Sequence, residues 1–304
     1  MFKKLKHQQY GYLFVAPFII GFLVFGLYPV INTIVLSFTD RTLMSSSYRF
    51  IGLQNFRQLF ADSTFTTAIK NTWELWLMNF IPQIGIAFLL AIWFTNNRLK
   101  IKGVGIWRMI FYMPNLMMAS AVAALFFSLF SYYGPVNQLL VRSGFLTEAV
   151  DFLRKPAVAR GLVVFIQWWM WFGQTTILLM AAMTTISPSL YEAAEVDGAG
   201  TFQMFRMITL PLIKPVLIYI LVTSLVGGMQ MFDIPYLLTD GRGSPGNSIL
   251  TNTINMYMKF HSSKGHIGAA SAVGLVVFLM TSIVALLIFF LLREKHDEPA
   301  EADK

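Results

Sequence analysis

The sequence has 304 residues, of which 56% are hydrophobic and 12% are charged, with a formal net charge of +8 and no cysteine. Soluble domains carry about 25% charged residues, so this composition is typical of a protein that faces lipid. The absence of cysteine from the sequence excludes disulfides, thiolate metal sites and cysteine nucleophiles. The basic residues lie in short segments between apolar runs, as is usual in membrane proteins. The net charge therefore does not indicate nucleic-acid binding.

Six charge-free apolar stretches are long enough to cross a membrane, which takes roughly 20 residues. The first follows Lys3, Lys4 and Lys6, as a secretory signal would, but it is longer than the apolar part of a signal peptide. We therefore expect it to remain as a span. The sequence predicts an all-α integral membrane protein with helices at about 11–38, 72–95, 109–130, 160–184, 211–232 and 268–292.

An even number of spans places both termini on the same side of the membrane. The Lys and Arg totals on the two sides are nearly equal, but the basic residues are denser on the side of the termini. The short basic loop with Arg98, Lys100, Lys102 and Arg108 lies on that side too. Under the positive-inside rule, the termini are expected in the cytoplasm.

The segments between spans are rich in turn formers, for example Tyr132-Tyr133-Gly134-Pro135, and predict loops with short surface helices. No short repeat divides the chain, and we expect a single transmembrane domain over residues 1–304. Its end, residues 293–304, is highly charged and predicts a solvated tail.

The most informative segment, about 187–209, lies between the fourth and fifth spans. Ser187 is a candidate N-cap with Pro188 at the first helical position, and Gly198 can take the positive φ that ends a helix. Thr201 is a candidate cap for the next helix. The sequence thus predicts a helix, a turn and a second helix. The small side chains allow another protein to approach the backbone closely; they are Ala193, Ala194 and Ala199.

This segment resembles the EAA loop of the permease subunits of binding-protein-dependent ABC importers. The family pattern E-A-A-x-x-x-G stands here as Glu192 to Gly198, and its I-x-L-P continuation stands as Ile208 to Pro211. Further segments resemble the carbohydrate, or maltose-type, branch of that family. They are Tyr12 to Pro17 with Tyr28-Pro29, Phe50 to Phe56, Arg108 to Pro114, and Phe232-Asp233 leading to Leu238 to Gly241.

The resemblance implies the type I importer permease fold, in a prokaryotic inner membrane, with the EAA loop in the cytoplasm. It implies a second homologous permease subunit, two copies of a cytoplasmic ATPase and an extracytoplasmic sugar-binding protein. The sequence has no Gly-x-x-x-x-Gly-Lys-Ser/Thr stretch, so ATP and Mg²⁺ are expected on the partner ATPase, with no cofactor in this chain. The residues implied in coupling to the ATPase are Tyr191, Glu192, Ala193, Ala194, Asp197, Gly198, Ala199 and Gly200.

Sugars offer hydroxyls and flat apolar faces, and polar groups inside spans tend to face a cavity. By the resemblance, the helices that flank the EAA loop line the pathway. The residues expected there are Trp171, Gln174, Ser224, Gly228, Gln230 and Met231. Other roles remain open: an interfacial belt for Trp168, Trp169 and Trp171, close helix packing at Gly227 and Gly228, and a solvated position for Asp233. We expect Asn79, Gln83 and Asn115 to form hydrogen bonds between helices.

The leading hypothesis is a sugar importer permease that is not itself an enzyme. An importer of an anionic solute, such as glycerol phosphate, should place Arg or Lys inside the pathway, and the fourth and fifth spans offer none deep in the membrane. A membrane-embedded transferase should show a catalytic His or a carboxylate cluster. Before the charged tail, the only tight acidic cluster is Glu192, Glu195 and Asp197, without a nearby His. An ion-driven carrier should show an ionisable residue in mid-span.

Overall fold

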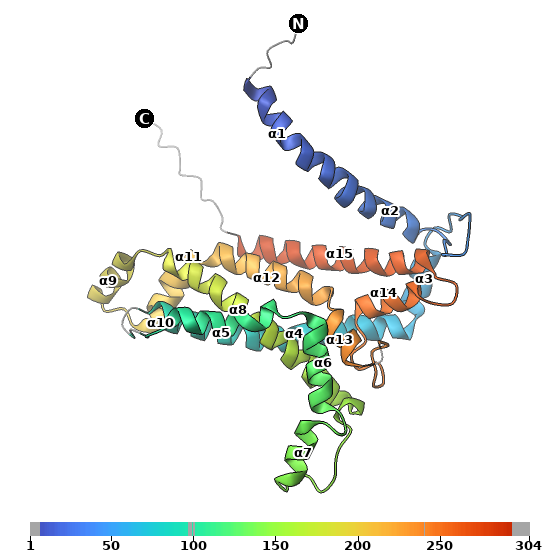
Figure 1. The fold of residues 1–304 in the computed structure, drawn as a ribbon. Coiled ribbons are helices and arrows are strands. Elements are labelled where there is room, and N and C mark those ends of the chain that lie inside the picture. Colours follow the sequence, from blue (N-terminus) through green and yellow to red (C-terminus); the bar gives the residue numbers. More distant parts are fainter. Residues whose placement is uncertain (1–6, 97–98, 100, 240, 294–304) are drawn as a thin grey trace. The chain divides into compact units, whose positions relative to one another are not determined.

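Within the described residues the regular elements are helices, joined by loops that hold two isolated β-bridges (Figure 1). The computed structural model describes residues 7–96, 99, 101–239 and 241–293, so the predicted charged tail lies outside the described residues beyond Arg293. The elements are α1 (His7–Gly21), η1 (Phe22–Leu27), α2 (Tyr28–Ser37), α3 (Gln54–Ala61), α4 (Ser63–Thr95), α5 (Val104–Leu116), α6 (Ala119–Phe130), α7 (Pro135–Arg142), η2 (Phe152–Arg154), α8 (Pro156–Thr184), α9 (Pro188–Val196), α10 (Thr201–Met204), η3 (Phe205–Thr209), α11 (Leu210–Leu212), α12 (Lys214–Met229), α13 (Asp233–Leu238), α14 (Asn252–Phe260) and α15 (Ile267–Leu292).

Six helical stretches among the described residues are long and apolar enough to cross a membrane, which is the number predicted. Helices suit this environment because they pair their own backbone groups where lipid offers no partner. The six stretches are Gly11–Ser37, Ser63–Thr95, Ala119–Arg142, Pro156–Thr184, Lys214–Leu238 and Ile267–Leu292.

The third predicted span, 109–130, is wrong as a single continuous helix. Met117 and Met118 are extended, with ψ of 142° and 133°, so α5 ends at Leu116 and α6 begins at Ala119. Pro114 does not explain the break, because proline disturbs the turn before it, and that turn stays helical in α5. The predicted stop at Tyr132 to Pro135 is confirmed: α6 ends at Phe130 and Pro135 opens α7.

The second span begins earlier than predicted, at Ser63 rather than 72. The carboxylate of Asp62 accepts hydrogen bonds from the backbone N–H and the hydroxyl of Thr64, at 2.9 and 2.6 Å. A carboxylate that satisfies free N–H groups stabilises the start of a helix. The first turns of α4 are too polar to be recognised as part of an apolar stretch.

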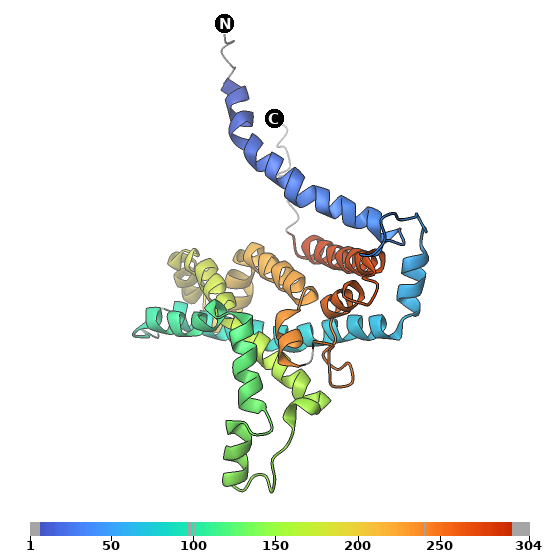
Figure 2. The same ribbon diagram turned by 45° about the vertical axis from the view of Figure 1, so that its right-hand side comes forward.

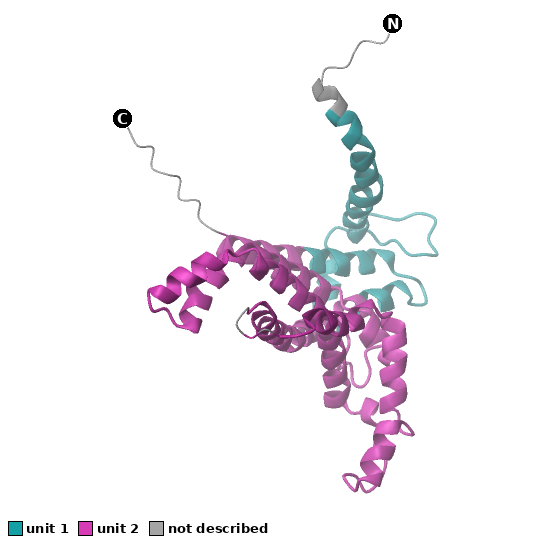
Figure 3. Ribbon diagram, turned by 60° about the vertical axis from the view of Figure 1, so that its left-hand side comes forward, with its two compact units in different colours: residues 1–65, 255–278 teal, residues 66–254, 279–304 magenta. Residues whose placement is uncertain are grey.

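The chain forms two compact units, residues 1–65 with 255–278 and residues 66–254 with 279–304 (Figure 3). In the first unit, the buried amide of Asn55 donates to the carbonyls of Ser37 and Thr39, both at 2.8 Å. These bonds tie α3 to the end of α2. That residues 1–304 act as one permease domain stays a prediction.

An ion pair joins α14 to the start of α4 within the first unit. Lys259 on α14 lies 2.8 Å from the carboxylate of Asp62. Burial alone would raise the pKa of Asp62, but the hydrogen bonds from Lys259 and Thr64 outweigh it and lower the pKa to about 2. The pair therefore contributes its full stability above pH 3.8, the ordinary value, and loses it as the pH falls through about 2.

In the second unit, α5 packs along α8 while α6 and α7 run away from α5 (Figures 1 and 2). The contact between α5 and α8 is close enough that a Cβ on Gly173 would overlap the backbone carbonyl of Phe111. A buried apolar cluster joins α4, α6, α8 and α13; it includes Leu75, Val122, Val163, Ile166, Ile234 and Leu238.

We predict that Gly173→Ala destabilises the protein by about 1–3 kcal/mol, because the added methyl forces α5 and α8 apart. Gly161→Ala is the matched control on the same helix, since its Cβ would meet nothing within 4 Å. Thermal unfolding in detergent checks this: Gly173→Ala should unfold at a clearly lower temperature than the control. Equal unfolding temperatures would contradict the close packing described here.

Candidate functional site

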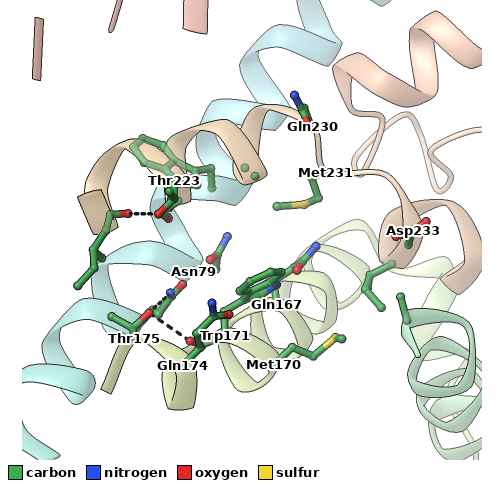
Figure 4. A pocket seen from close by; sticks show the side chains of 18 of the residues that line it. Asn79, Gln167, Met170, Trp171, Gln174, Thr175, Thr223, Gln230, Met231 and Asp233 are labelled. Carbon is green, nitrogen blue, oxygen red and sulfur yellow. Dashed lines mark hydrogen bonds between the residues drawn. The ribbon is translucent and has the colours of Figure 1, made fainter. Parts of the chain in front are cut away.

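A cavity of about 270 Å³ lies in the second unit between α4, α8, α12 and the start of α13 (Figure 4). On α8 each lining residue has another lining residue three or four positions away, which places them on one face of the helix. They are Gln167, Met170, Trp171, Gln174, Thr175 and Leu178.

All six residues predicted for the substrate pathway line this cavity. Trp171 and Gln174 come from α8, and Ser224 and Gly228 come from α12. Gln230 and Met231 follow in the short link between α12 and α13, where Gln230 takes a non-helical conformation. The fold thus brings together residues that are up to 60 positions apart in the sequence, from Trp171 to Met231.

Trp76 on α4 contributes a cavity wall that the sequence analysis missed. Its indole Nε1 donates to the hydroxyl of Ser224 at 3.1 Å, and its ring stacks on Phe80 with the centroids 5.4 Å apart. A Cβ on Gly228 would overlap the indole ring, whereas one on Gly227 would meet nothing within 4 Å. The predicted close packing therefore applies to Gly228, which also lines the cavity.

Two buried amides of α4 behave differently from each other. Gln83 donates through Nε2 to the hydroxyl of Thr175 on α8 at 2.7 Å, as expected of an interhelical hydrogen bond. Asn79 instead donates to the carbonyl of Leu75 in its own helix at 2.9 Å, so the prediction of an interhelical bond is wrong there. A short amide inside a helix reaches its own preceding turn more easily than a neighbouring helix.

The lining combines amides, hydroxyls and aromatic rings. The amides are Asn79, Gln83, Gln167, Gln174 and Gln230, and the aromatic residues are Trp76, Trp171, Tyr219 and Phe232. Among the described lining residues, Asp233 carries the one formal charge, and it is exposed, as its predicted solvated position requires. Amides both donate and accept hydrogen bonds, so this lining matches a ligand that does both and has an apolar face.

The three tryptophans of α8 take separate places. Trp171 is 46% exposed and lines the cavity. Trp168 stacks on Phe172, with the ring centroids 5.2 Å apart, and Trp169 packs against the buried apolar cluster. These contacts give the rings roles in packing and cavity lining, and a position in an interfacial belt stays a prediction.

The predicted helix, turn and second helix at 187–209 are present as α9, the turn 197–200, and α10 with η3. Gly198 has φ of +79°, as expected of the residue that ends α9. Ser187 occupies the N-cap position with Pro188 at the start of the helix, as predicted, but its hydroxyl bonds to that of Ser189 at 2.8 Å and makes no capping hydrogen bond. Gly200, rather than Thr201, occupies the N-cap position of α10.

The residues predicted for ATPase coupling are together on α9 and its turn, and no residue of α9 is buried. Glu192, Ala193, Asp197, Gly198 and Gly200 are exposed, while Tyr191, Ala194 and Ala199 are half-buried. Val196 is 88% exposed and Phe202, just beyond the turn, is 75% exposed. Two large apolar side chains beside small residues and carboxylates form a surface that another protein could cover.

Residues 75–295 match the family described as the binding-protein-dependent transport system inner membrane component. The chain belongs to this family. It is 34% identical over 286 residues to the lactose transport system permease protein LacF of Rhizobium radiobacter, covering 94% of each chain. It is also 34% identical over 282 residues to the arabinooligosaccharides transport system permease protein AraP of Bacillus subtilis, covering 90% of this chain and 87% of that one.

Solved structures resemble the fold over almost its whole length. One is a bacterial ABC transporter involved in the import of the acidic polysaccharide alginate, with a TM-score of 0.76, 28% identity and coverage of 92% of this chain and 93% of that chain. Another is the bacterial alginate transporter in complex with an alginate pentasaccharide-bound periplasmic protein, with a TM-score of 0.77, 27% identity and coverage of 93% of both.

These findings confirm several predictions made from the sequence. The chain is an all-α inner membrane protein with the type I importer permease fold, and it is a permease of a binding-protein-dependent importer. As a transport component of that family it is not an enzyme. The positions of the termini relative to the membrane are not among the confirmed predictions.

We predict that Gly228→Ala lowers substrate uptake at least several-fold, because the added methyl displaces the Trp76 ring that it would overlap. Gly227→Ala, one residue away with open space around it, should keep uptake near that of the unmodified protein. The measurement is uptake by cells that express equal amounts of each variant with its partner subunits. Unchanged uptake in Gly228→Ala would show that the Trp76 wall does not shape the working cavity.

Proposed function

We propose that this chain forms half of the translocation pathway of an ATP-driven importer of uncharged mono- or oligosaccharides. The observation that carries the proposal is the lining of the cavity, where amides and hydroxyls alternate with aromatic rings. Such groups suit the hydroxyls and apolar faces of a sugar, since aromatic rings contribute apolar contact and amides complete the hydrogen bonds. The names of the relatives, which specify lactose and arabinooligosaccharides, support the same class of substrate.

The other half of the pathway would come from a second, homologous permease subunit. Two copies of a cytoplasmic ATPase would bind ATP and Mg²⁺ and would receive the exposed surface of α9. Its small residues, Ala193 and Ala194, let a partner approach the backbone, and Glu192 and Asp197 offer carboxylates to basic groups. An extracytoplasmic sugar-binding protein would deliver the substrate, in keeping with the family's dependence on binding proteins.

ATP binding would close the ATPase pair and displace α9, and the attached helices would move as rigid bodies to open the cavity on alternate sides. In this arrangement both termini and α9 lie in the cytoplasm. The density of Lys and Arg near the termini supports that orientation. The surface helices α3 and α14 would then lie outside, because they fall in connections on the other side of the spans.

An anionic solute, such as glycerol phosphate or a uronate sugar, is the alternative substrate class. A cavity that holds a full negative charge away from water needs a paired cation. No Arg, Lys or His is among the described residues of the lining, and Asp233 would repel an anion. The cavity therefore favours a neutral substrate, although a structural relative imports an acidic polysaccharide.

The test is transport by the whole importer, purified from its native membrane through this subunit and reconstituted into liposomes with its binding protein. A panel of neutral sugars, including lactose and maltose, is compared with glycerol 3-phosphate and alginate oligosaccharides. We predict that at least one neutral sugar enters more than about tenfold faster than either anion, because burying an unpaired charge costs several kcal/mol. Preference for an anion would contradict the proposal, as would a subunit that purifies with no ATPase.

The coupling role of α9 yields a separate prediction. Gly198→Val forces a β-branched residue into φ of +79° and should distort the end of α9. Gly144→Val is the matched control, since Gly144 has φ of +77° in the loop after α7 and also has open space around it. We expect Gly198→Val to insert normally but to lose most of its co-purifying ATPase and its uptake, while Gly144→Val retains both. Equal retention of the ATPase would exclude α9 as the docking helix.

A further inference from the structure

Tyr191 of α9 forms a hydrogen bond with a residue further along its own chain. Its hydroxyl lies 2.8 Å from the hydroxyl of Thr209, 18 positions further along. Tyr191 is half-buried and Thr209 is 6% exposed. This distance is that of a good O–H···O hydrogen bond, and partial burial protects it from exchange with water.

Thr209 lies at the end of a π-helical turn in the segment that leads to the cavity. It is the last residue of the π-helical turn η3, Phe205–Thr209, and its carbonyl accepts a hydrogen bond from the N–H of Ile213 at 3.0 Å. Phe205, at the start of the same turn, meets Phe88 of α4 edge to face, with the ring centroids 5.9 Å apart. π-Helical turns are rare and often occur at functional positions.

The helix beyond this turn reaches the substrate cavity directly. Ile213, which is 1% exposed, donates to Thr209 and accepts from Leu217, so the hydrogen-bond ladder continues into α12. From α12 the side chains of Tyr219, Thr223 and Ser224 line the cavity. A displacement applied at Thr209 therefore reaches the cavity wall through α11 and α12, which are joined at Ile213.

The covalent connection between α9 and this helix is too flexible to transmit a displacement of α9 well. It passes through the turn 197–200, where Gly198 takes φ of +79° and Gly200 is extended. Glycines are conformationally permissive, so such a turn absorbs a push instead of passing it on. The hydrogen bond between Tyr191 and Thr209 bypasses the turn.

We propose that Tyr191 and Thr209 are positioning residues for energy coupling, through which a displacement of α9 reaches α12 and the cavity. The proposal rests on the proposed function, in which α9 docks on the ATPase. It gives Tyr191 a role inside the permease, distinct from the exposed residues of α9 that would touch the partner. Loss of either hydroxyl leaves α9 able to dock but connected to α12 through the glycine turn alone.

The experiment uses the complete importer in liposomes with Tyr191→Phe, Thr209→Val and the double variant. Both substitutions keep nearly the same volume and remove one hydroxyl. The readout is the amount of sugar transported per ATP hydrolysed, with the neutral sugar from the panel that the unmodified importer takes up fastest. Tyr12→Phe is the matched control, because Tyr12 is 76% exposed.

We expect each single variant to lower the transport-to-hydrolysis ratio about three- to tenfold, in line with the loss of one hydrogen bond. The double variant should be no worse than the singles, since the two hydroxyls act as one contact. The unfolding temperature, the amount of co-purifying ATPase and the Tyr12→Phe ratio should be unchanged.

An unchanged ratio in Tyr191→Phe would overturn the proposal, and so would additive losses in the double variant. The Gly198→Val variant distinguishes this failure from failure of the proposed function. If Gly198→Val loses the ATPase while Tyr191→Phe keeps a normal ratio, α9 docks but this hydrogen bond does not transmit. If both variants behave normally, α9 is not the coupling helix.

Discussion

Polar side chains inside apolar helices must have a hydrogen-bond partner or face a water-filled cavity, because hydrocarbon supplies neither partner nor water. In this chain the constraint is met by gathering such side chains on the facing surfaces of α4, α8 and α12. Gln83 pairs with Thr175, and Trp76 pairs with Ser224. Further amides of α4 and α8, Asn79, Gln167 and Gln174, line the cavity, so the requirement that keeps them from lipid also builds a surface for a hydroxylated ligand.

Small residues then set how closely the elements approach each other. Gly173 allows the backbone of α5 to touch α8, and Gly228 allows the indole of Trp76 to lie flat beside α12. On α9 and the turn after it, alanines and glycines leave the surface accessible from outside. The same device thus serves packing inside the permease and, in the proposed assembly, docking of another protein.

Much of this could be predicted from the sequence because the signals are local. Long apolar stretches identify spans, and Gly198 identifies a turn, since each depends on residues that are neighbours in the chain. The residues of α8 and α12 that line the cavity could be predicted by the same logic together with the family resemblance. The proposal of coupling through α9 likewise starts from a contiguous motif.

What could not be predicted depends on contacts between distant segments. The break between α5 and α6 lies within an apolar stretch and after Pro114, at a position that no residue in the sequence marks. The early start of α4 depends on the Asp62 carboxylate, and the cavity wall at Trp76 depends on the absence of a side chain at Gly228. The hydrogen bond between Tyr191 and Thr209 joins residues 18 positions apart. No pattern in the sequence predicts this bond or the π-helical turn that ends at Thr209.

The central claim is that this chain holds part of a neutral sugar in the cavity between α4, α8 and α12. The most direct measurement is an electron cryomicroscopy structure of the assembled importer, trapped with its sugar. The account predicts sugar density against Trp171, within hydrogen-bond distance of amides such as Gln174 and Gln230. Sugar density confined to the partner permease, with this cavity closed by its own side chains, would contradict it.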